Sequence, residues 1–149
     1  MNKKQFVCDK IIEFDKYLAN VKIGVPDNFK IINPFNSDSK YKTNQVVEAF
    51  YHKFYSDNKK RRMILGSSPA RKGTAVTGVP FEDAAHLQKE TGIYIDDFYV
   101  NKASSNFLYD VIETYGVCKK FYNDFYMNFV CPLGIVRVNS KDNEVNCNY

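Results

Sequence analysis

The segment at residues 63–90 restricts the fold of this chain more than any other. Its first three residues are apolar and predict a buried strand, whereas Gly-Ser-Ser-Pro at 66–69 favours a tight turn over a longer strand. A helix is expected at 82–90. A strand, a loop of small residues and a helix in this order can direct backbone N–H groups and a helix N-terminus at an anion. The segment therefore predicts an anion-binding loop, although an ordinary strand-to-helix connection would explain the same glycines.

The residue types in this loop favour a ligand that carries both a phosphate and a base. Arg71 and Lys72 supply positive charge, and Phe81, which follows a proline, offers a flat face for stacking. The loop is not a dinucleotide fingerprint, because it lacks Gly-x-Gly-x-x-Gly. The order Lys72-Gly73-Thr74 also differs from the Gly-Lys-Ser/Thr of a P-loop.

The composition is that of a globular chain. At 149 residues, with 44% hydrophobic and 26% charged residues, it suits one domain with a sizeable core. The net charge of +4 permits a polyanionic partner without requiring one. The four cysteines form no Cys-x-x-Cys pair and share no ligand spacing with the histidines, so neither a zinc site nor a disulfide scaffold is expected. No signal peptide and no apolar run near the ~20 residues of a membrane span are visible, so a cytoplasmic location without membrane contact is expected.

Hydrophobic periodicity predicts alternating helices and strands. Helices are expected at 4–19, with Phe6, Phe14 and Leu18 inward, at 43–56, and from Ser104 or Ser105 to Gly116. Strands are expected at 63–65, 126–130 and 135–138, and a polar tail at 139–149. This pattern predicts an α/β fold with a small, largely parallel central sheet flanked by helices. Ligands of such sheets bind at the carboxyl ends of the strands, where the 66–81 loop and the 128–133 segment would meet.

Several charged residues have two interpretations. The basic run at 59–62 would attract phosphate, or would form a solvated helix end beside an apolar strand, and the second interpretation is favoured. His52 and His86 are expected on the outer faces of their helices. Glu82 and Asp83 are explained as first-turn acids that favour the helix dipole.

The two loop segments carry a family resemblance. Gly66-Ser67-Ser68-Pro69-Ala70, Gly73 and Thr77-Gly78-Val79-Pro80-Phe81 resemble the first motif of the uracil-DNA glycosylase superfamily, in the branch of the single-strand-selective monofunctional enzymes and their bacterial relatives. Three further segments are similar to the bacterial branch, namely Asn33-Pro34-Phe35, the aromatic run at 50–55, and the run from 121 that ends in Cys131-Pro132-Leu133-Gly134. The resemblance implies a three-layer α/β/α fold. It also implies an enzyme that flips a damaged base out of DNA and hydrolyses its N-glycosidic bond.

The resemblance assigns roles around the base. Phe81 would stack on the flipped base, and backbone N–H groups around Ser67 and Ser68 would face the base or the departing anion. Asn128 would read the Watson–Crick edge of the base, in an alignment that is shifted by one position. Ser68 stands where the family has an asparagine or an acid that positions the attacking water. The serine would act in its place, at a loss of order 10²–10³ in rate. Glu82 or Asp83 would be the substitutes for water activation.

The resemblance also names the partners. Arg71, Lys72 and Gly73 would lie near the DNA backbone, and the protein would act on DNA as a monomer. No metal or cofactor is implied, because a uracil anion is a tolerable leaving group when hydrogen bonds hold its charge.

The family's second motif, with a histidine that supports the leaving base, normally lies well downstream of the Pro-Leu-Gly segment, and the sequence stops before any such motif. Either the histidine is absent, or the sequence is a truncated form. We expect 1–149 to be a single glycosylase-like domain that is incomplete at its C-terminus. The alternatives are a nucleic-acid-binding relative without catalysis and a small phosphate- or nucleotide-binding protein on a similar sheet.

Overall fold

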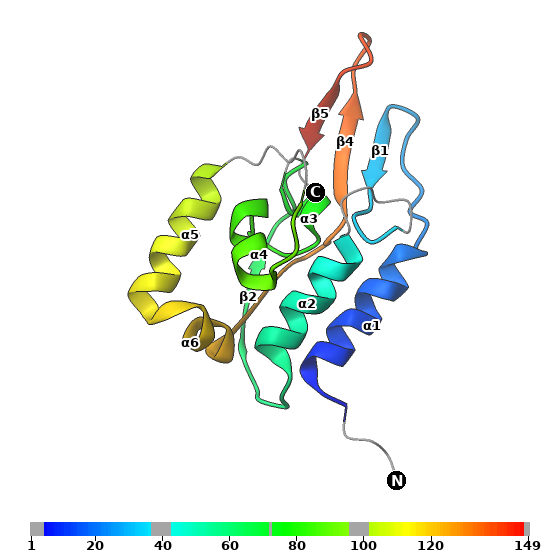
Figure 1. The fold of residues 1–149 in the computed structure, drawn as a ribbon. Helices are drawn as coiled ribbons and strands as arrows, with labels where there is room; N and C mark the ends of the chain where they lie inside the picture. Colours follow the sequence, from blue (N-terminus) through cyan, green and yellow to red (C-terminus); the bar gives the residue numbers. More distant parts are fainter. Residues whose placement is uncertain (1–4, 37–42, 72, 96–101, 148–149) are drawn as a thin grey trace.

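The computed structural model describes residues 5–36, 43–71, 73–95 and 102–147. The helices are α1 (Val7–Ala19), α2 (Thr43–Tyr55), α3 (Thr74–Thr77), α4 (Ala84–Thr91), α5 (Lys102–Tyr115) and α6 (Val117–Asp124). The strands are β1 (Phe29–Ile32), β2 (Arg62–Gly66), β3 (Phe125–Phe129), β4 (Gly134–Val138) and β5 (Glu144–Cys147). Figure 1 shows α1 and α2 side by side, α5 and α6 on the other side of the molecule, and β4 and β5 projecting as an arm.

The strands form two sheets. β2 and β3 are parallel, with Arg62 opposite Phe125 and Gly66 opposite Phe129. β1, β4 and β5 form an antiparallel sheet in that order. The α/β class and the parallel pairing of the loop-bearing strand are therefore confirmed. Strand β5 lies within the polar tail expected from the sequence, and β4 joins the antiparallel sheet because the short turn between β4 and β5 permits only that pairing.

Helix α2 supplies the centre of the core. Its apolar residues Val46, Val47 and Phe50 are buried, and the helix buries Tyr55 as well. The ring of Phe50 meets that of Tyr122 edge-on, with 5.1 Å between ring centroids. Such edge contacts between aromatic rings stabilise a core beyond their area alone. The aromatic richness of the chain is thus used largely for packing.

The buried face of α1 agrees only in part with the predicted one. Phe6 and Phe14, which we expected inward, are 45% and 43% exposed. Leu18 is buried as expected, and Cys8, Ile11, Ile12 and Asp15 face the core with it. Both faces follow helical spacing, and the contacts with α2 decide between them. As a result a carboxyl group, that of Asp15, enters the interior.

Strand β2 forms where a strand was expected, but its side chains are exposed and not buried. Met63 is 61% exposed, Ile64 38% and Leu65 54%. Among the described residues, β2 is paired along one edge only, by β3. The apolar run was read correctly as a strand and wrongly as an interior one.

The basic run at 59–62 lies at the amino end of β2, away from the loop that follows Gly66. The side chain of Arg61 is 3% exposed, and its guanidinium donates to both carboxylate oxygens of Asp57 at 2.8 and 2.9 Å. It also donates to the carbonyl of Tyr122 at 2.7 Å and lies 4.6 Å from the centre of the Tyr55 ring. The hydrogen bond from Arg61 lowers the pKa of Asp57. Arg61 therefore holds the start of β2 in place.

Candidate functional site

The candidate site begins where β2 ends, at Gly66. A Cβ at this position would lie 2.6 Å from the ring of Phe129 and 2.9 Å from that of Phe81. The two rings are 4.8 Å apart between centroids and 30° from parallel. Glycine is required here because it allows two aromatic rings to close over the end of the strand.

The Thr-Gly-Val-Pro-Phe segment is held by its own hydroxyls and by α2. The Thr77 hydroxyl donates to the carbonyl of Val79 at 3.2 Å, and Thr43 of α2 donates to the carbonyl of Val76 at 3.0 Å. Gly78 ends α3 in the left-handed conformation, with φ of 73°. The segment is therefore a rigid connection that α2 fixes in place.

Gly78→Ala is expected to lower the free energy of unfolding by about 2–4 kcal/mol, because it adds strain at positive φ to a clash. The added Cβ would lie 2.8 Å from Val47 and 2.9 Å from Thr43. Urea unfolding checks the size of the effect. Gly92→Ala is the matched control, since Gly92 has φ of 72° but open space around it. An equal loss in both variants would mean that the contacts with α2 contribute nothing.

Phe81 is the residue that this connection positions. It is a non-glycine residue with φ of 61°, a conformation that side chains rarely adopt outside constrained sites. Its N–H donates to the hydroxyl of Thr74 at 3.0 Å. Its half-buried ring lines an apolar cavity of about 510 Å³ together with Ile64, Met127 and Leu108. The structure thus places a constrained aromatic ring at the carboxyl end of the parallel strands.

Glu82, the next residue, points into the interior. It is 1% exposed and accepts hydrogen bonds from the hydroxyls of Tyr109, at 2.7 Å, and Tyr122. Burial raises the pKa of Glu82 to about 7, while the two hydroxyls act in the opposite direction. Glu82 is therefore a buried carboxyl group in a cage of two tyrosines. Glu82 is not the first-turn acid that the sequence suggested, because α4 begins at Ala84, after the N-cap Asp83.

Asp83 caps α4 and pairs with a histidine. Its carboxylate accepts from the backbone N–H of His86 at 2.9 Å and lies 2.7 Å from Nδ1 of that ring. Burial acts to raise the pKa of Asp83, but hydrogen bonds from His86 and Ser105 outweigh it and the pKa is lowered. The His86 ring is stacked on Tyr109, with 3.3 Å between centroids. The expectation that His86 lies on an outer face is only partly met, and the Asp-x-x-His spacing at a helix start was the signal for this pair.

The predicted loop residues have different surroundings. Ser67 is exposed and Ser68 is partly buried. Gly73 is buried and immediately precedes α3. Its backbone N–H donates to the carbonyl oxygen of Ala70 at 3.0 Å. The Arg71 guanidinium lies 3.6 Å from the Glu144 carboxylate, and its backbone N–H donates to the side chain of Asn146 at 2.9 Å. Strand β5 therefore braces the loop, a contact that the sequence did not reveal. Lys72 lies outside the described residues.

Asn128 is not on the same face of the sheet as Phe81. Its amide donates to the hydroxyl of Tyr126 at 2.7 Å and accepts from the N–H of Phe129 at 2.8 Å. Side chains alternate along a strand, so Tyr126 and Asn128 share one face, while Met127 and Phe129 share the face of Phe81. The structure brings Asn128 to the carboxyl edge of the sheet, but with its amide engaged on the opposite face.

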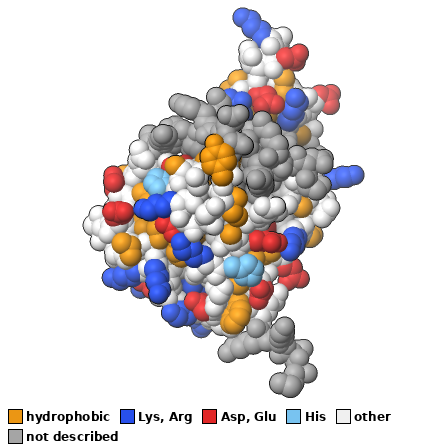
Figure 2. Space-filling model, in the orientation of Figure 1, with side chains coloured by type: hydrophobic (Ala, Val, Ile, Leu, Met, Phe, Trp, Pro, Cys, Tyr) orange, Lys and Arg blue, Asp and Glu red, His pale blue; other side chains and the backbone are white. Residues whose placement is uncertain are grey.

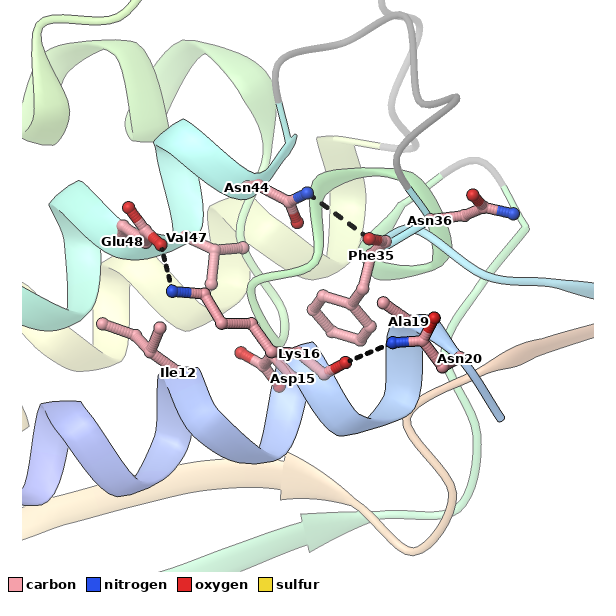
Figure 3. A pocket seen from close by; sticks show the side chains of 10 residues that line it. All are labelled: Ile12, Asp15, Lys16, Ala19, Asn20, Phe35, Asn36, Asn44, Val47 and Glu48. Atoms are coloured by element: carbon pink, nitrogen blue, oxygen red, sulfur yellow. Dashed lines mark hydrogen bonds and ion pairs between the residues drawn. The ribbon is translucent and has the colours of Figure 1, made fainter. Parts of the chain in front are cut away.

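A second cavity, of about 380 Å³, lies between α1 and α2 (Figure 3). Asp15 and Phe35 line it, and an ion pair between Lys16 and Glu48 of 3.0 Å spans its side. Asp15 is 7% exposed, and its Oδ2 has no hydrogen-bond partner within the part of the chain that the structure describes. Burial raises the pKa of Asp15 to about 8. No pattern in the sequence marked this carboxyl group.

One group of side chains has the composition of a metal site. Cys8, Asp9 and His52 each place one ligand atom within 4.8 Å of the others, at the start of α1 and the end of α2. Asp9, however, already accepts the N–H of Phe6 at 2.9 Å, and the Cys8 thiol donates to the same carboxylate at 3.8 Å. His52 is exposed, as expected. Hydrogen bonding at the helix start accounts for this cluster without a metal.

No helix in the described segments is both long enough and apolar enough to cross a membrane.

Two comparisons with known proteins, one with family models and one with solved structures, found a match. The family model of the uracil DNA glycosylase superfamily matches residues 52–148. Among solved structures, the wild-type SMUG2 protein of Pedobacter heparinus has 38% sequence identity and a TM-score of 0.86. The match covers 97% of this chain and 61% of that chain, so this chain spans less than two thirds of the solved structure. A search of curated proteins found no match.

Proposed function

Because this chain belongs to the uracil DNA glycosylase superfamily, we propose that it is a DNA base-excision glycosylase. Its substrate is uracil, or a related damaged base, after the base has turned out of the DNA stack. Water attacks the anomeric carbon of the sugar, the bond from that carbon to the base breaks, and the electron pair leaves with the base as an anion. The water leaves its hydroxyl on the sugar, and the proton that it loses passes to solvent. No metal or cofactor takes part in this proposal.

The placement of Phe81 is the observation that carries the proposal. Its ring is held at the carboxyl edge of the parallel strands, over a cavity with an apolar lining, by a backbone conformation that costs free energy. A flat apolar surface of this kind binds a flipped base by stacking. Ser68 would position the water, and the backbone at Ser67 and Ser68 would stabilise the departing anion. In this proposal Asn128 reads the base edge only after its amide leaves Tyr126.

The proposed contacts with DNA lie beside the loop that follows β2. Arg71, with Lys72 and Gly73, would bind the phosphate backbone beside the loop. The Arg71 side chain is 31% exposed, so a phosphate would compete with Glu144 for it. Figure 2 shows basic and acidic side chains interspersed over the face that it draws. On this face the charges therefore form no continuous basic track.

A second candidate function is DNA binding without catalysis. It is favoured by the carboxyl groups next to the loop. Glu82 is 1% exposed in its tyrosine cage, and Asp83 is 3% exposed and engaged by His86. Neither acid is in a position to activate water, so catalysis would depend on Ser68.

Phe81→Ala is expected to lower the rate of uracil excision about 10- to 100-fold, since base stacking contributes about 1–3 kcal/mol per base. The assay uses single-stranded and duplex oligonucleotides with one uracil, and alkali reveals the abasic sites. Ser68→Ala tests the water-positioning role. Phe14→Ala, which removes an aromatic ring that is 43% exposed on α1, is the matched control and should leave the rate unchanged. Gel retardation without abasic sites, at excess wild-type protein, would establish the binding function instead.

A further inference from the structure

The cavity between α1 and α2 combines an apolar interior with a polar rim (Figure 3). Ile12, Phe35 and Val47, which line its interior, are 7%, 3% and 2% exposed. The polar side chains of the rim are exposed or half-buried; they are Lys16, Asn20, Asn36, Asn44 and Glu48. The volume of about 380 Å³ is in the range of small-molecule sites, which are largely apolar with a few polar groups that orient the ligand. None of these residues lines the Phe81 cavity, so the two cavities are separate.

Asp15 is the polar group of the interior. Its side chain lines the cavity, and Figure 3 shows the carboxyl group between the two helices, close to the Phe35 ring. Asp15 is 7% exposed, and its Oδ2 has no hydrogen-bond partner in the described part of the chain. Buried carboxyl oxygens are nearly always paired, because an unpaired one loses its hydration without compensation. The described residues thus leave this carboxyl group without the partner that its burial requires.

Neighbouring side chains do not supply that partner. Tyr51 of α2 and Tyr126 of β3 are near enough for the charge of Asp15 to act, together with burial, to raise the pKa of each, but neither bonds to its Oδ2. Lys16 is the one cation among the described residues that line the cavity, and its ammonium lies 3.0 Å from the Glu48 carboxylate. No side chain in the described segments therefore neutralises an ionised Asp15.

The rim of the cavity is rich in hydrogen-bond acceptors. The side-chain amide of Asn20 donates to the backbone carbonyl of Lys16 at 3.2 Å, and that of Asn44 donates to the backbone carbonyl of Phe35 at 3.4 Å; Figure 3 draws both bonds. With N–H groups of both amides used in this way, their side-chain oxygens are left to accept from a ligand. Glu48 adds a carboxylate to the same rim. This lining fits a ligand with N–H donors, whereas an anion would face two carboxyl groups.

We propose that this cavity binds a small organic cation, an amine or an amidine with an apolar body. Its charged N–H group donates to the Asp15 carboxylate, and its apolar part packs against Phe35 and Val47. Such a charge-assisted hydrogen bond is stronger in a buried site than in water, and it gives Oδ2 the missing partner. A calcium ion fits less well, because it needs about 6–8 oxygen ligands and the other interior residues are apolar. Binding exchanges the cation for the proton that the buried carboxyl group holds in the empty site, and this proton passes to solvent.

Benzamidine is the probe for this site, because it joins an amidinium group to an apolar ring, and benzamide is its uncharged counterpart. Titration of the 149-residue chain is followed by calorimetry and by NMR shifts of the Ala19 and Val47 amides, which border the cavity. At pH 8 we expect one saturable site with a Kd of order 0.1–1 mM for benzamidine, and binding of benzamide at least tenfold weaker. The samples contain no DNA, so the result is independent of the proposed glycosylase activity.

The affinity for benzamidine should fall about 50-fold from pH 8 to pH 6. Burial raises the pKa of Asp15 to about 8, so about half of the carboxyl groups are protonated at pH 8 and about 99% at pH 6, where the cation must displace the proton. Tyr51 and Tyr126 do not titrate in this range, because burial raises the pKa of both, that of Tyr126 to about 12. Lys16 and Glu48, the other charged groups at the cavity, form an ion pair, and a Lys16→Met/Glu48→Gln variant should keep the same pH dependence.

Asp15→Asn should weaken benzamidine binding at least tenfold at pH 8 and abolish its pH dependence, because the amide carries no charge. Ala19→Leu keeps the carboxyl group but adds bulk at a residue that lines the cavity, and should also weaken binding at least tenfold. Asp27→Asn, at an exposed acid outside the cavity, is the matched control and should bind as the wild type does. Circular dichroism verifies that the variants are folded. Benzamidine binding that Asp15→Asn and Ala19→Leu leave unchanged, or no saturable binding by the wild type, would overturn the proposal.

Discussion

Asp15→Asn is expected to raise the free energy of unfolding by about 3–5 kcal/mol at pH 8 and to change it little at pH 4. Burial raises the pKa of Asp15 from 3.8 to about 8. Between these values the folded protein keeps a proton that the unfolded chain has released. The stability of the wild type therefore falls as the pH rises through this window, and the loss is complete above pH 8. Asparagine is uncharged throughout and avoids the loss.

Urea unfolding at pH 4, 6 and 8 measures this effect as the difference between variant and wild type. Asp27→Asn is the control, because Asp27 is exposed in the segment between α1 and β1. A constant difference between Asp15→Asn and wild type over this range would mean that Asp15 is ionised in the folded protein. The cavity beside it would then have to supply a partner for the charge.

Glu82→Ala is expected to lower the free energy of unfolding by about 3–5 kcal/mol, because it combines a cavity with lost hydrogen bonds. The side chain is 1% exposed, and the hydroxyls of Tyr109 and Tyr122 donate to it. Without the carboxyl group, both hydroxyls are buried with no acceptor. The position of Phe81 should also loosen, because Glu82 is its immediate neighbour.

Thermal and urea unfolding check this prediction. Glu113→Ala is the control, because Glu113 lies on the exposed side of α5. Its free energy of unfolding should be within about 0.5 kcal/mol of the wild-type value. Tyr109→Phe and Tyr122→Phe, singly and together, separate the two hydrogen bonds in a double-mutant cycle. Each is expected to cost about 1–3 kcal/mol. If Glu82→Ala costs no more than Glu113→Ala, the tyrosine cage does not stabilise the fold.

Local patterns predicted the elements that depend on neighbouring residues. The periodicity of 43–56 predicted α2, and the change from an apolar run to glycine and serine located the end of β2 at Gly66. The Thr-Gly-Val-Pro-Phe segment identified the family because its backbone needs particular residues. Gly78 adopts a left-handed backbone conformation, and its surroundings leave no room for a Cβ. Phe81, three residues later, also has a positive φ. The roles of Ser67, Ser68, Asn128 and Arg71 remain predictions.

Contacts between distant segments decided the rest. Periodicity allowed two faces for α1, and packing against α2 selected the one that buries Asp15. Glu82 looked like an ordinary first-turn acid until α5 and α6 brought Tyr109 and Tyr122 to it. The loop is braced by Glu144 and Asn146, which lie more than 70 residues further along the chain. Sequence alone determined the strand, the turn and the family, since these depend on backbone conformation and local spacing. Burial and side-chain partners were decided only by the tertiary structure, because a carboxyl group or an apolar strand is buried or exposed according to what packs against it.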